Sequence, residues 1–284
     1  MEIFLQLHLA SLAIDVFRLS IWLLIILVIF APLEKLFPLH PRKFFRKAFL
    51  IDFIYFFLSG LLPKFFIVLP MSLIALGLNG FIPEEFLESA ANLPMWSRFG
   101  AAMIVGEFGT YWGHRWMHEI PFLWRFHAIH HSAEHIDWLV NTRAHPIDLA
   151  FPRLCGFVPM YLFGLAQVSG NSLDLIPLLV TLVGTIWGFF IHANLRWRFG
   201  WLEWVVSTPA FHHWHHANDA PEFINKNYAS LLPWMDKLFG TFYLPKKAWP
   251  TSYGINDPTP SSLLQQLIQP FSSIKKLPVR KTGF

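Results

Sequence analysis

Long apolar blocks constrain this chain more than any other feature of its sequence. The first block contains the run IWLLIILVIFAPL at residues 21–33. A helix needs about 20 consecutive apolar residues to cross ~30 Å of hydrocarbon, and it suits a membrane because it satisfies its backbone hydrogen bonds internally. Charged residues make up only 14% of the chain, against about 25% in an ordinary soluble domain. We therefore expect an all-α polytopic membrane protein.

The apolar blocks predict about five transmembrane helices. They lie at residues 9–33, 51–78 and 96–112, and in a hairpin whose limbs are residues 151–168 and 173–190. We divide the chain into an N-terminal transmembrane region (1–96), a histidine-containing domain (97–250) and a C-terminal tail (251–284). The pattern of the tail is typical of an interfacial helix or of a partly basic disordered terminus. Its apolar residues, which precede a basic end, are Leu263, Leu264, Leu267 and Ile268.

The charges in the loops predict which side of the membrane each loop occupies. The linker after the first span is basic and the linker after the second is acidic, the residues being Lys35, Arg42, Lys43, Arg46 and Lys47, then Glu84, Glu85 and Glu88. Basic loops stay in the cytoplasm. Residues 114–147 and the chain after about His192 should therefore form a cytoplasmic, histidine-rich helical cap. Pro63 and Lys64 interrupt the second span, and a re-entrant hairpin there would flip the first span's side but keep the histidines together.

Three histidine clusters share that side: HRWMH at 114–118, HAIHH at 127–131 and HHWHH at 212–216. In a helix, His114 and His118 lie one turn apart on one face, and His127, His130 and His131 lie on one stripe. Imidazole suits iron, copper, nickel and zinc. The clusters hold nine of the 14 histidines, whereas one metal takes about four to six ligands. Two metal ions are the simplest interpretation.

Other kinds of site have little support in the sequence. The single Cys155 excludes a disulfide framework and a Cys/His zinc pattern. The formal charge of +4 is spread over loops beside apolar segments, which indicates topology signals rather than nucleic-acid binding. Neither an HExxH motif nor a serine nucleophile supports a zinc hydrolase. Away from the clusters, His8, His40 and His135 are expected to be ordinary core or interface residues.

Longer segments around the clusters strengthen the metal interpretation. Between about Phe108 and Leu244 they read HRWMH, PFLWRFHAIHHS, DWLVNTRAHP, IHANLRW, STPAFHHWHH and NYASLLPWMDKLFGTF. In content and order they resemble the fatty acid hydroxylase superfamily, membrane non-haem di-iron enzymes that include sterol desaturases and hydroxylases. The resemblance implies that residues 97–250 hold two Fe2+ ions that activate O2. It implies as ligands His114, His118, His127, His130, His131, His192, His212, His215 and His216.

Further polar and aromatic residues are candidates for supporting roles. Glu107 lies inside the third span on one helical stripe with His114 and His118, and a carboxylate in a span is treated as functional. An ordinary helix–helix hydrogen bond is the alternative. The other possible ligands or residues that orient ligands are His145, His213, Asp137, Asn194 and Asp219, although each is also explained as a packing or capping residue. Residues expected to line a substrate passage, or to form an interfacial belt, are Tyr111, Trp112, Trp138 and Trp214.

Together these features predict an O2-dependent oxidoreductase that hydroxylates or desaturates a lipid or sterol-like substrate. No dinucleotide fingerprint, haem attachment motif or ferredoxin cysteine pattern is visible, so electrons should come from a separate ferredoxin or cytochrome with its reductase. The alternative is a membrane metal-binding or transport protein with histidines as transit ligands. A transporter should carry polar residues through several spans. A catalytically idle scaffold is disfavoured by the completeness of the clusters.

Overall fold

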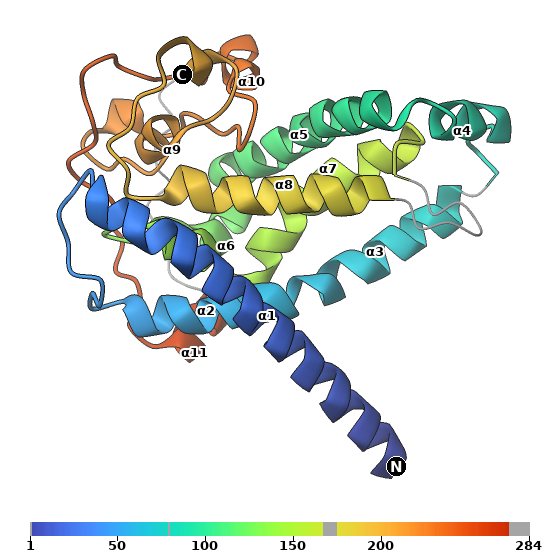
Figure 1. Cartoon of the computed structure of the whole chain (residues 1–284), viewed down its shortest axis with the longest axis horizontal. Coiled ribbons are helices and arrows are strands. Elements are labelled where there is room, and N and C mark those ends of the chain that lie inside the picture. The colour runs from blue at the N-terminus through green and yellow to red at the C-terminus, as the bar shows by residue number, and fades with distance from the viewer. Residues whose placement is uncertain (1, 79, 167–174, 273–284) are drawn as a thin grey trace.

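Long helices lie side by side and carry a group of shorter helices and loops at one end (Figure 1). The computed structural model describes residues 2–78, 80–166 and 175–272, with side chains from Leu9 onward. Every regular element within these ranges is a helix, which confirms the predicted all-α class.

The body and the cap are distinguished by helix length. The long helices are α1 (Glu2–Leu36), α2 (Phe49–Leu61), α3 (Pro63–Leu78), α5 (Met95–Glu119), α7 (Pro146–Leu162) and α8 (Leu175–His192). The cap contains α6 (Pro121–His131), α9 (Pro209–His215), α10 (Trp234–Leu238), α11 (Leu263–Ile268), and the 3-10 turns η1 (Trp138–Thr142), η2 (Gly200–Trp204), η3 (Pro221–Phe223) and η4 (Gln269–Phe271). The short helix α4 (Glu84–Ala91) lies at the opposite end (Figure 1).

Three helical segments are long and apolar enough to cross a membrane: Leu9–Leu36, Phe49–Leu78 and Leu175–His192. They correspond to the predicted spans at 9–33, 51–78 and 173–190. The predicted spans at 96–112 and 151–168 fall on α5 and α7, which are helices but do not belong to this apolar set. The five-helix count therefore stays a prediction. Residues 167–174, at the tip of the predicted hairpin, lie outside the described residues.

The interruption at Pro63 breaks the second span without reversing it. Proline lacks a backbone N–H and cannot continue the hydrogen-bond ladder of the preceding helix. The helix accordingly ends at Leu61 and restarts at Pro63. In Figure 1, α3 continues from α2 away from the cap, so the two helices form one broken element rather than a re-entrant hairpin.

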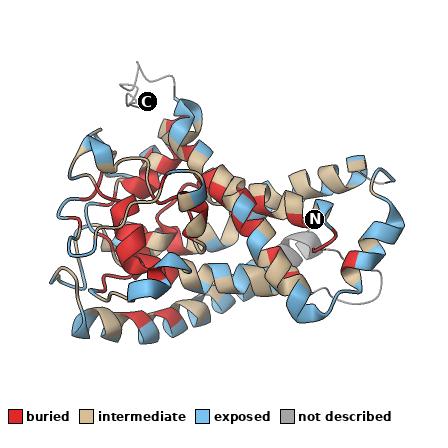
Figure 2. Ribbon diagram, turned by 90° about the horizontal axis from the view of Figure 1, so that it is seen from above, coloured by how far each residue is buried: buried red, intermediate tan, exposed pale blue. Residues whose placement is uncertain are grey.

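Exposure follows the division between body and cap. Buried residues gather where the long helices meet the cap, whereas the rest of the long helices is mostly half-buried or exposed (Figure 2). Leu24, Val28, Leu69 and Leu73 are examples of large apolar side chains on that outer surface. Such a surface suits a lipid environment, because lipid does not penalise exposed apolar side chains.

Glycines let α5 and α7 approach closely. A Cβ at Gly109 would collide with the backbone oxygen of Cys155, and a Cβ at Gly113 would lie 2.8 Å from the Cα of Pro152. Backbones this close leave no room for a side chain. The two helices thereby fix the relative positions of the residues at their cap-side ends.

Two boundaries differ from the sequence predictions or refine them. Helix α7 begins at Pro146 rather than at residue 151, because His145 caps it by accepting a hydrogen bond from the backbone N–H of Ile147 at 3.1 Å. In the tail, residues Leu263–Ile268 form α11, which confirms a helix there. Gln266 of this helix is buried and accepts a hydrogen bond from the Tyr55 hydroxyl. The basic end of the tail lies outside the described residues.

The end of α1 is tied to the cap by one carboxylate. Glu34 accepts hydrogen bonds from the backbone N–H groups of Trp138 and Asn194, both at 2.8 Å. Arg46, in the linker that follows, binds Asp137 and Asp52. These contacts connect the first two helices to η1 and to the segment after α8.

The close approach of α5 and α7 gives a test of the fold. Gly109→Ala should lower the thermal unfolding midpoint, because overpacking a tight contact costs about 1–3 kcal/mol and this contact involves rigid backbone. Gly100 lies in the same helix with open space around it, so Gly100→Ala should leave the midpoint unchanged or raise it. Thermal unfolding of the two variants in detergent provides the measurement. Equal midpoints would contradict the packing described here.

Candidate metal centre

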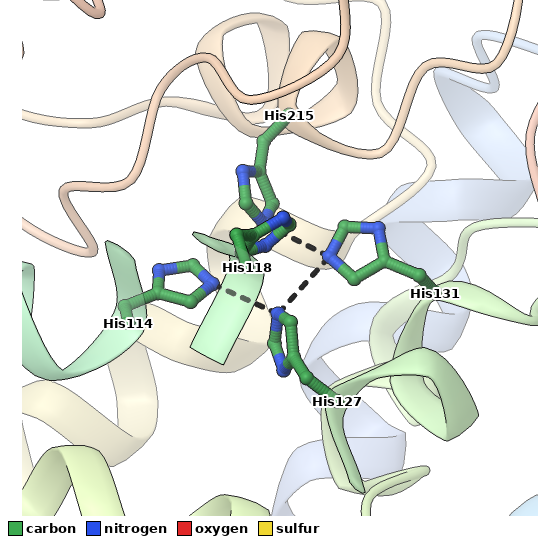
Figure 3. Close-up of side chains that lie close together, drawn as sticks. All are labelled: His114, His118, His127, His131 and His215. Carbon is green, nitrogen blue, oxygen red and sulfur yellow. Dashed lines mark hydrogen bonds between the residues drawn. The ribbon is translucent and has the colours of Figure 1, made fainter. Parts of the chain in front are cut away.

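Nine histidine side chains converge in two adjacent groups inside the cap end of the bundle. The first group contains His114, His118, His127, His131 and His215, drawn in Figure 3, and the second contains His130, His192, His212 and His216. Within each group, one ring nitrogen from every residue lies within 4.8 Å of the others. Eight of the nine residues are buried, and the remaining one, His118, is half-buried with both ring nitrogens inside the protein. They are the nine positions implied as ligands by the sequence resemblance.

The groups do not coincide with the sequence clusters. Helix α5 supplies two residues to the five-histidine group only, and the last residue of α8, His192, belongs to the four-histidine group only. Helix α6 and the segment formed by α9 and its C-cap each divide their histidines between the two groups. In α6, for example, His127 and His131 face one group and His130 the other.

Local signals in the sequence start the two shared helices. Pro121 occupies the first position of α6, and Pro209 that of α9. Proline suits this position because its φ angle is already helical and its missing N–H would have no helical partner there. The Thr208 hydroxyl caps α9 by accepting a hydrogen bond from the backbone N–H of Phe211 at 3.4 Å. Helical spacing then sets which imidazoles share a face.

In the five-histidine group, three rings are held through Nδ1. The Nδ1 of His114 lies 2.6 Å from the carbonyl oxygen of Tyr228, and that of His215 lies 2.9 Å from the carbonyl oxygen of Lys226. The Nδ1 of His127 lies 2.7 Å from a carboxylate oxygen of Asp148. These acceptors have no hydrogen to give, so Nδ1 of each ring carries the hydrogen.

The four-histidine group repeats this arrangement. The Nδ1 of His192 lies 2.7 Å from the carbonyl oxygen of Gly188, one turn earlier in α8. The Nδ1 of His130 lies 3.2 Å from the carbonyl oxygen of Arg143. Both rings therefore also carry their hydrogen on Nδ1, and each presents a bare Nε2 to the centre of the group.

Burial keeps the imidazoles of the cap neutral. It lowers the pKa of His114 and His127 to about 3, desolvation being the largest cause. The pKa values of His130, His131 and His215 fall well below the usual range of histidine, for the same reason and because other imidazoles lie beside them. Neutral imidazole is the form that binds metal.

The facing Nε2 atoms fit metal ions better than hydrogen bonds. The Nε2 atoms of His114 and His127 lie 3.1 Å apart, as do those of His130 and His192. In each pair both nitrogens carry lone pairs, so no hydrogen can lie between them. Two nitrogen ligands of one ion, each ~2.0–2.1 Å from it, would lie roughly 2.9–3.4 Å apart. The donor sets therefore match what two cations would require.

Six residues named above as possible ligands or as residues that orient ligands have their main contacts outside the two groups. Glu107 accepts hydrogen bonds from the backbone N–H groups of Leu231 and Leu232. His213 lies beside the Tyr253 hydroxyl and the Ala193 carbonyl oxygen, so its ring points away from its neighbours in α9. The remaining four contact other parts of the cap or the N-terminal linker: Asp137 with Arg46, Asn194 with the backbone of His40, Asp219 with Thr251, and His145 with the backbone of Leu267 and Ile147.

The aromatic residues expected to line a substrate passage are largely packed. Tyr111 is fully buried, and its hydroxyl lies 2.9 Å from that of Thr241. Trp138 is buried in a cluster with residues of α1, α2 and α8. Trp214 is buried with its Nε1 donating to the carbonyl oxygen of Ala248, and Trp112 is half-buried against Phe239. No lining role follows from these contacts.

Two residues that the sequence reasoning missed touch the five-histidine group. Asp148 orients His127. An acidic residue in the first turn of an apolar helix could have drawn attention to it, but the sequence analysis expected this helix to start later, at residue 151. The ring of Trp124 lies 5.3 Å from that of His118 and 5.6 Å from that of His131. Trp124 also lines a surface cleft with Arg125, Ala128, Ile129, Ile255, Asp257, Pro258, Thr259, Gln269 and Pro270.

The lowered imidazole pKa values predict that acid destabilises the metal-free protein. His114 and His127 stay neutral in the folded chain to pH about 3, whereas in the unfolded chain they take up protons below pH 6.5. The contribution of these two rings to the free energy of unfolding is complete above the pKa that they have in the unfolded chain. As the pH falls below that value, the free energy of unfolding decreases by up to about 1.4 kcal/mol per pH unit for each ring.

Chelator-treated protein should therefore show a falling thermal midpoint as the pH is lowered from about 7.5 to about 6. Below about pH 6, Asp148 has the opposite effect on stability. Burial raises its pKa to about 6, so the folded chain takes up this proton more readily than the unfolded chain does. A midpoint that stays level or rises between pH 7.5 and 6 would contradict the burial of neutral imidazoles.

Comparison with known proteins finds a family profile and several relatives that are similar in sequence to this chain. The sequence profile described as fatty acid hydroxylase matches residues 99–241, half of the chain, a range that contains all nine histidines. An ornithine lipid hydroxylase of Rhizobium tropici is 38% identical over 180 residues, which cover 63% of this chain and 52% of that protein.

More distant relatives carry related names. The human alkylglycerol monooxygenase is 31% identical over 170 residues, covering 59% of this chain and 35% of that protein. A methylsterol monooxygenase of Arabidopsis thaliana is 27% identical over 168 residues, covering 55% of this chain and 57% of that protein. The chain thus spans about half the length of the bacterial and plant relatives and about a third of the human one. No solved structure matches the chain.

Proposed function

We propose that this chain, which belongs to the fatty acid hydroxylase family, uses O2 to hydroxylate a lipid or sterol-like substrate at two iron ions. One observation carries the proposal: buried, neutral imidazoles turn bare Nε2 atoms toward two centres, while backbone carbonyls and one carboxylate hold their Nδ1 hydrogens. Metal-binding histidines are held through the second nitrogen in this way.

Each histidine group would hold one ion. The five-histidine group offers His114, His118, His127, His131 and His215, and the four-histidine group offers His130, His192, His212 and His216. Two ferrous ions at these positions would supply the electrons that activate O2 for attack on an unactivated C–H bond. Family membership favours iron, because imidazole alone also suits copper, nickel and zinc.

The chain's own residues prepare the site in three ways. The Nδ1 hydrogen bonds fix the ring orientations before any ion arrives, so little conformational freedom is lost on binding. The carboxylate of Asp148 accepts a hydrogen bond from the Nδ1–H of His127, which makes the Nε2 of that ring a stronger electron-pair donor to a metal ion. Burial of the imidazoles excludes water, which protects reactive species from side reactions.

The substrate class follows from the apolar surroundings and from the relatives. Hydroxylase and monooxygenase relatives are named for ornithine lipid, alkylglycerol and methylsterol. All are lipids or sterols, and their shared reaction type favours oxygen insertion over desaturation. A substrate of this kind could keep its apolar part beside the long helices while its target carbon reaches the cap.

Electrons would come from a separate protein, a ferredoxin or a cytochrome with its reductase. The sequence carries no cofactor motif of its own. The cleft beside Trp124 is a suitable place for the donor, because this side chain contacts both the cleft and the five-histidine group. Basic residues around the cap would attract an acidic partner.

A transport function fits the geometry less well. Transit ligands must release their ion, and they usually form a path through the membrane. Here the nine imidazoles lie at one end of the bundle, and several rings are locked by hydrogen bonds. This arrangement suits resident ions.

Metal analysis gives the first test of this proposal. Purified protein should contain about two metal ions per chain, because nine imidazoles exceed what one ion can bind. His130→Ala and His215→Ala each remove a ligand from a different group, so each variant should lose metal and turnover. Metal content by mass spectrometry and substrate oxidation are the measurements. Zinc in an overexpressed sample would still agree, since zinc competes well for imidazole.

His135→Ala provides the matched control. His135 is exposed and lies outside both groups, so the variant should keep its metal and its activity. One metal or none in active wild-type protein would refute the two-ion site. Equal damage in His135→Ala and His130→Ala would refute the assignment of ligands.

Topology gives an independent test. The loop charges predict that the cap is cytoplasmic, where reducing equivalents are available. A reporter fused after Phe284 should therefore report a cytoplasmic location, and one inserted between Glu85 and Glu88 an external one. Both reporters on one side would mean that a span between them is wrongly assigned. An external C-terminus would remove the basis for a cytoplasmic electron donor.

A further inference from the structure

The 3-10 turn η2 lies beside the cap-side end of a helix that can span a membrane. Trp187 and Phe190 belong to the last two turns of α8, within the apolar segment Leu175–His192. The indole Nε1 of Trp187 donates to the carbonyl oxygen of Ser207 at 2.9 Å, and the ring of Phe190 lies 6.0 Å from that of Phe199. Phe199 precedes η2 and Ser207 follows it. Both flanks of the turn are therefore held at the level of the spanning segment.

The side chains of η2 are arranged in the opposite way to those of a turn that faces water. Its charged residue, Glu203, is buried and accepts two hydrogen bonds from the Arg198 guanidinium, at 3.0 and 3.1 Å, and one from the backbone N–H of Phe199 at 2.9 Å. Large apolar side chains face outward instead. Those exposed in η2 and directly after it are Trp201 (72%), Leu202 (38%), Trp204 (55%) and Val205 (47%). A contiguous apolar patch of this kind indicates an interaction with another protein or with a membrane.

The patch connects with the exposed apolar surface of the long helices. Trp204 lies under the Lys237 side chain of α10, and the next residue of α10, Leu238, is exposed. Phe239, at the end of α10, contacts Phe108, an exposed residue of α5, with ring centroids 6.2 Å apart. Exposed apolar side chains thus lead from η2 over α10 to the outer surface of the bundle. This continuity favours lipid as the partner of the patch, because lipid covers the long helices.

A second group of exposed aromatic side chains lies at the start of another spanning segment. Phe44 and Phe45 are exposed and pack on Phe49, the first residue of α2, with ring centroids 5.4 and 5.0 Å away. The segment Phe49–Leu78 begins at the end of the bundle where α8 ends (Figure 1). Aromatic residues are enriched where spanning helices meet the membrane surface. Both groups therefore indicate one boundary between bilayer and water, at the cap.

We propose that η2 inserts into the surface of the bilayer and anchors the cap there, with Trp201 and Trp204 between the head groups and the acyl chains. Indole suits this layer because its ring is apolar and its N–H is polar. Lys237, whose Nζ lies 3.0 Å from the centroid of the Trp204 ring, can extend its amine to lipid phosphates. The anchor holds the last turn of α8, which ends at His192, close to the lipid. This inference does not depend on which reaction the chain catalyses.

Fluorescence quenching in lipid nanodiscs tests the position of the turn. Full-length Trp201→Cys is labelled with bimane and compared in discs of brominated phosphatidylcholine and in ordinary discs with iodide in the buffer. Trp201 is largely exposed, so its replacement removes little packing, and Val205→Cys serves if the first variant does not fold. Brominated lipid should remove most of the fluorescence, and iodide should leave it nearly unchanged. Quenching by iodide alone, or by neither agent because protein covers the turn, would overturn the inference.

Ser252→Cys is the matched control on the cap. Ser252 is exposed in a polar loop, where its carbonyl oxygen accepts a hydrogen bond from the backbone N–H of Asn218 at 2.8 Å. A label there should be quenched by iodide and not by brominated lipid. Cys155, the single native cysteine, is half-buried, and unaltered protein treated with the label gives the blank. A label on Phe45→Cys should behave like the one at position 201. The same response at positions 201 and 252 would refute the anchor.

Discussion

The structure depends on one constraint: histidine Nε2 atoms whose lone pairs point at each other must be held close together. Neutral imidazoles such as His114 and His127 approach each other through Nε2 atoms that cannot share a hydrogen. The fold fixes the opposite nitrogens of these rings: Asp148 accepts a hydrogen bond from His127, and the carbonyl oxygens of Tyr228, Lys226, Arg143 and Gly188 accept hydrogen bonds from His114, His215, His130 and His192. Lys226 and Tyr228 lie in one segment, whereas Arg143 and Gly188 belong to two other parts of the chain. The cap must therefore be assembled as a whole before either group has its shape.

The long helices supply the rigid frame for that assembly. Helix α5 carries the first pair of histidines beyond the point where Gly109 and Gly113 press it against α7. The same contact places Asp148, at the start of α7, behind His127. Glu34 in turn joins the end of α1 to the segment that follows His192. The geometry of the imidazoles therefore depends directly on how the helices pack.

Local features of the fold and site were readable from the sequence, since they depend on spacing and composition. Helical periodicity predicted that His114 and His118 share a face. The length of the apolar blocks predicted five spans, and three of these fall on helical segments that are long and apolar enough to cross a membrane. The spacing in HHWHH also separated His213 from its neighbours, and the structure turns its ring elsewhere. Long-range pairing could not be read in this way. Neither the division of the nine histidines into two groups nor the partners of Asp148 and Asn194 follows from neighbours along the chain.

The sharing of α6 and α9 between the two groups has a thermodynamic consequence. An ion bound by His127 and His131 immobilises the helix that also carries His130, and an ion bound by His212 and His216 orders the segment that carries His215. Since the hydrogen bonds to Nδ1 already hold most of the rings, only the ordering that remains in each shared helix would be completed by the first of the two proposed ions. Any such ordering would favour binding of the second ion, and the linkage would be reciprocal. The two proposed sites would then be coupled through the helices that they share.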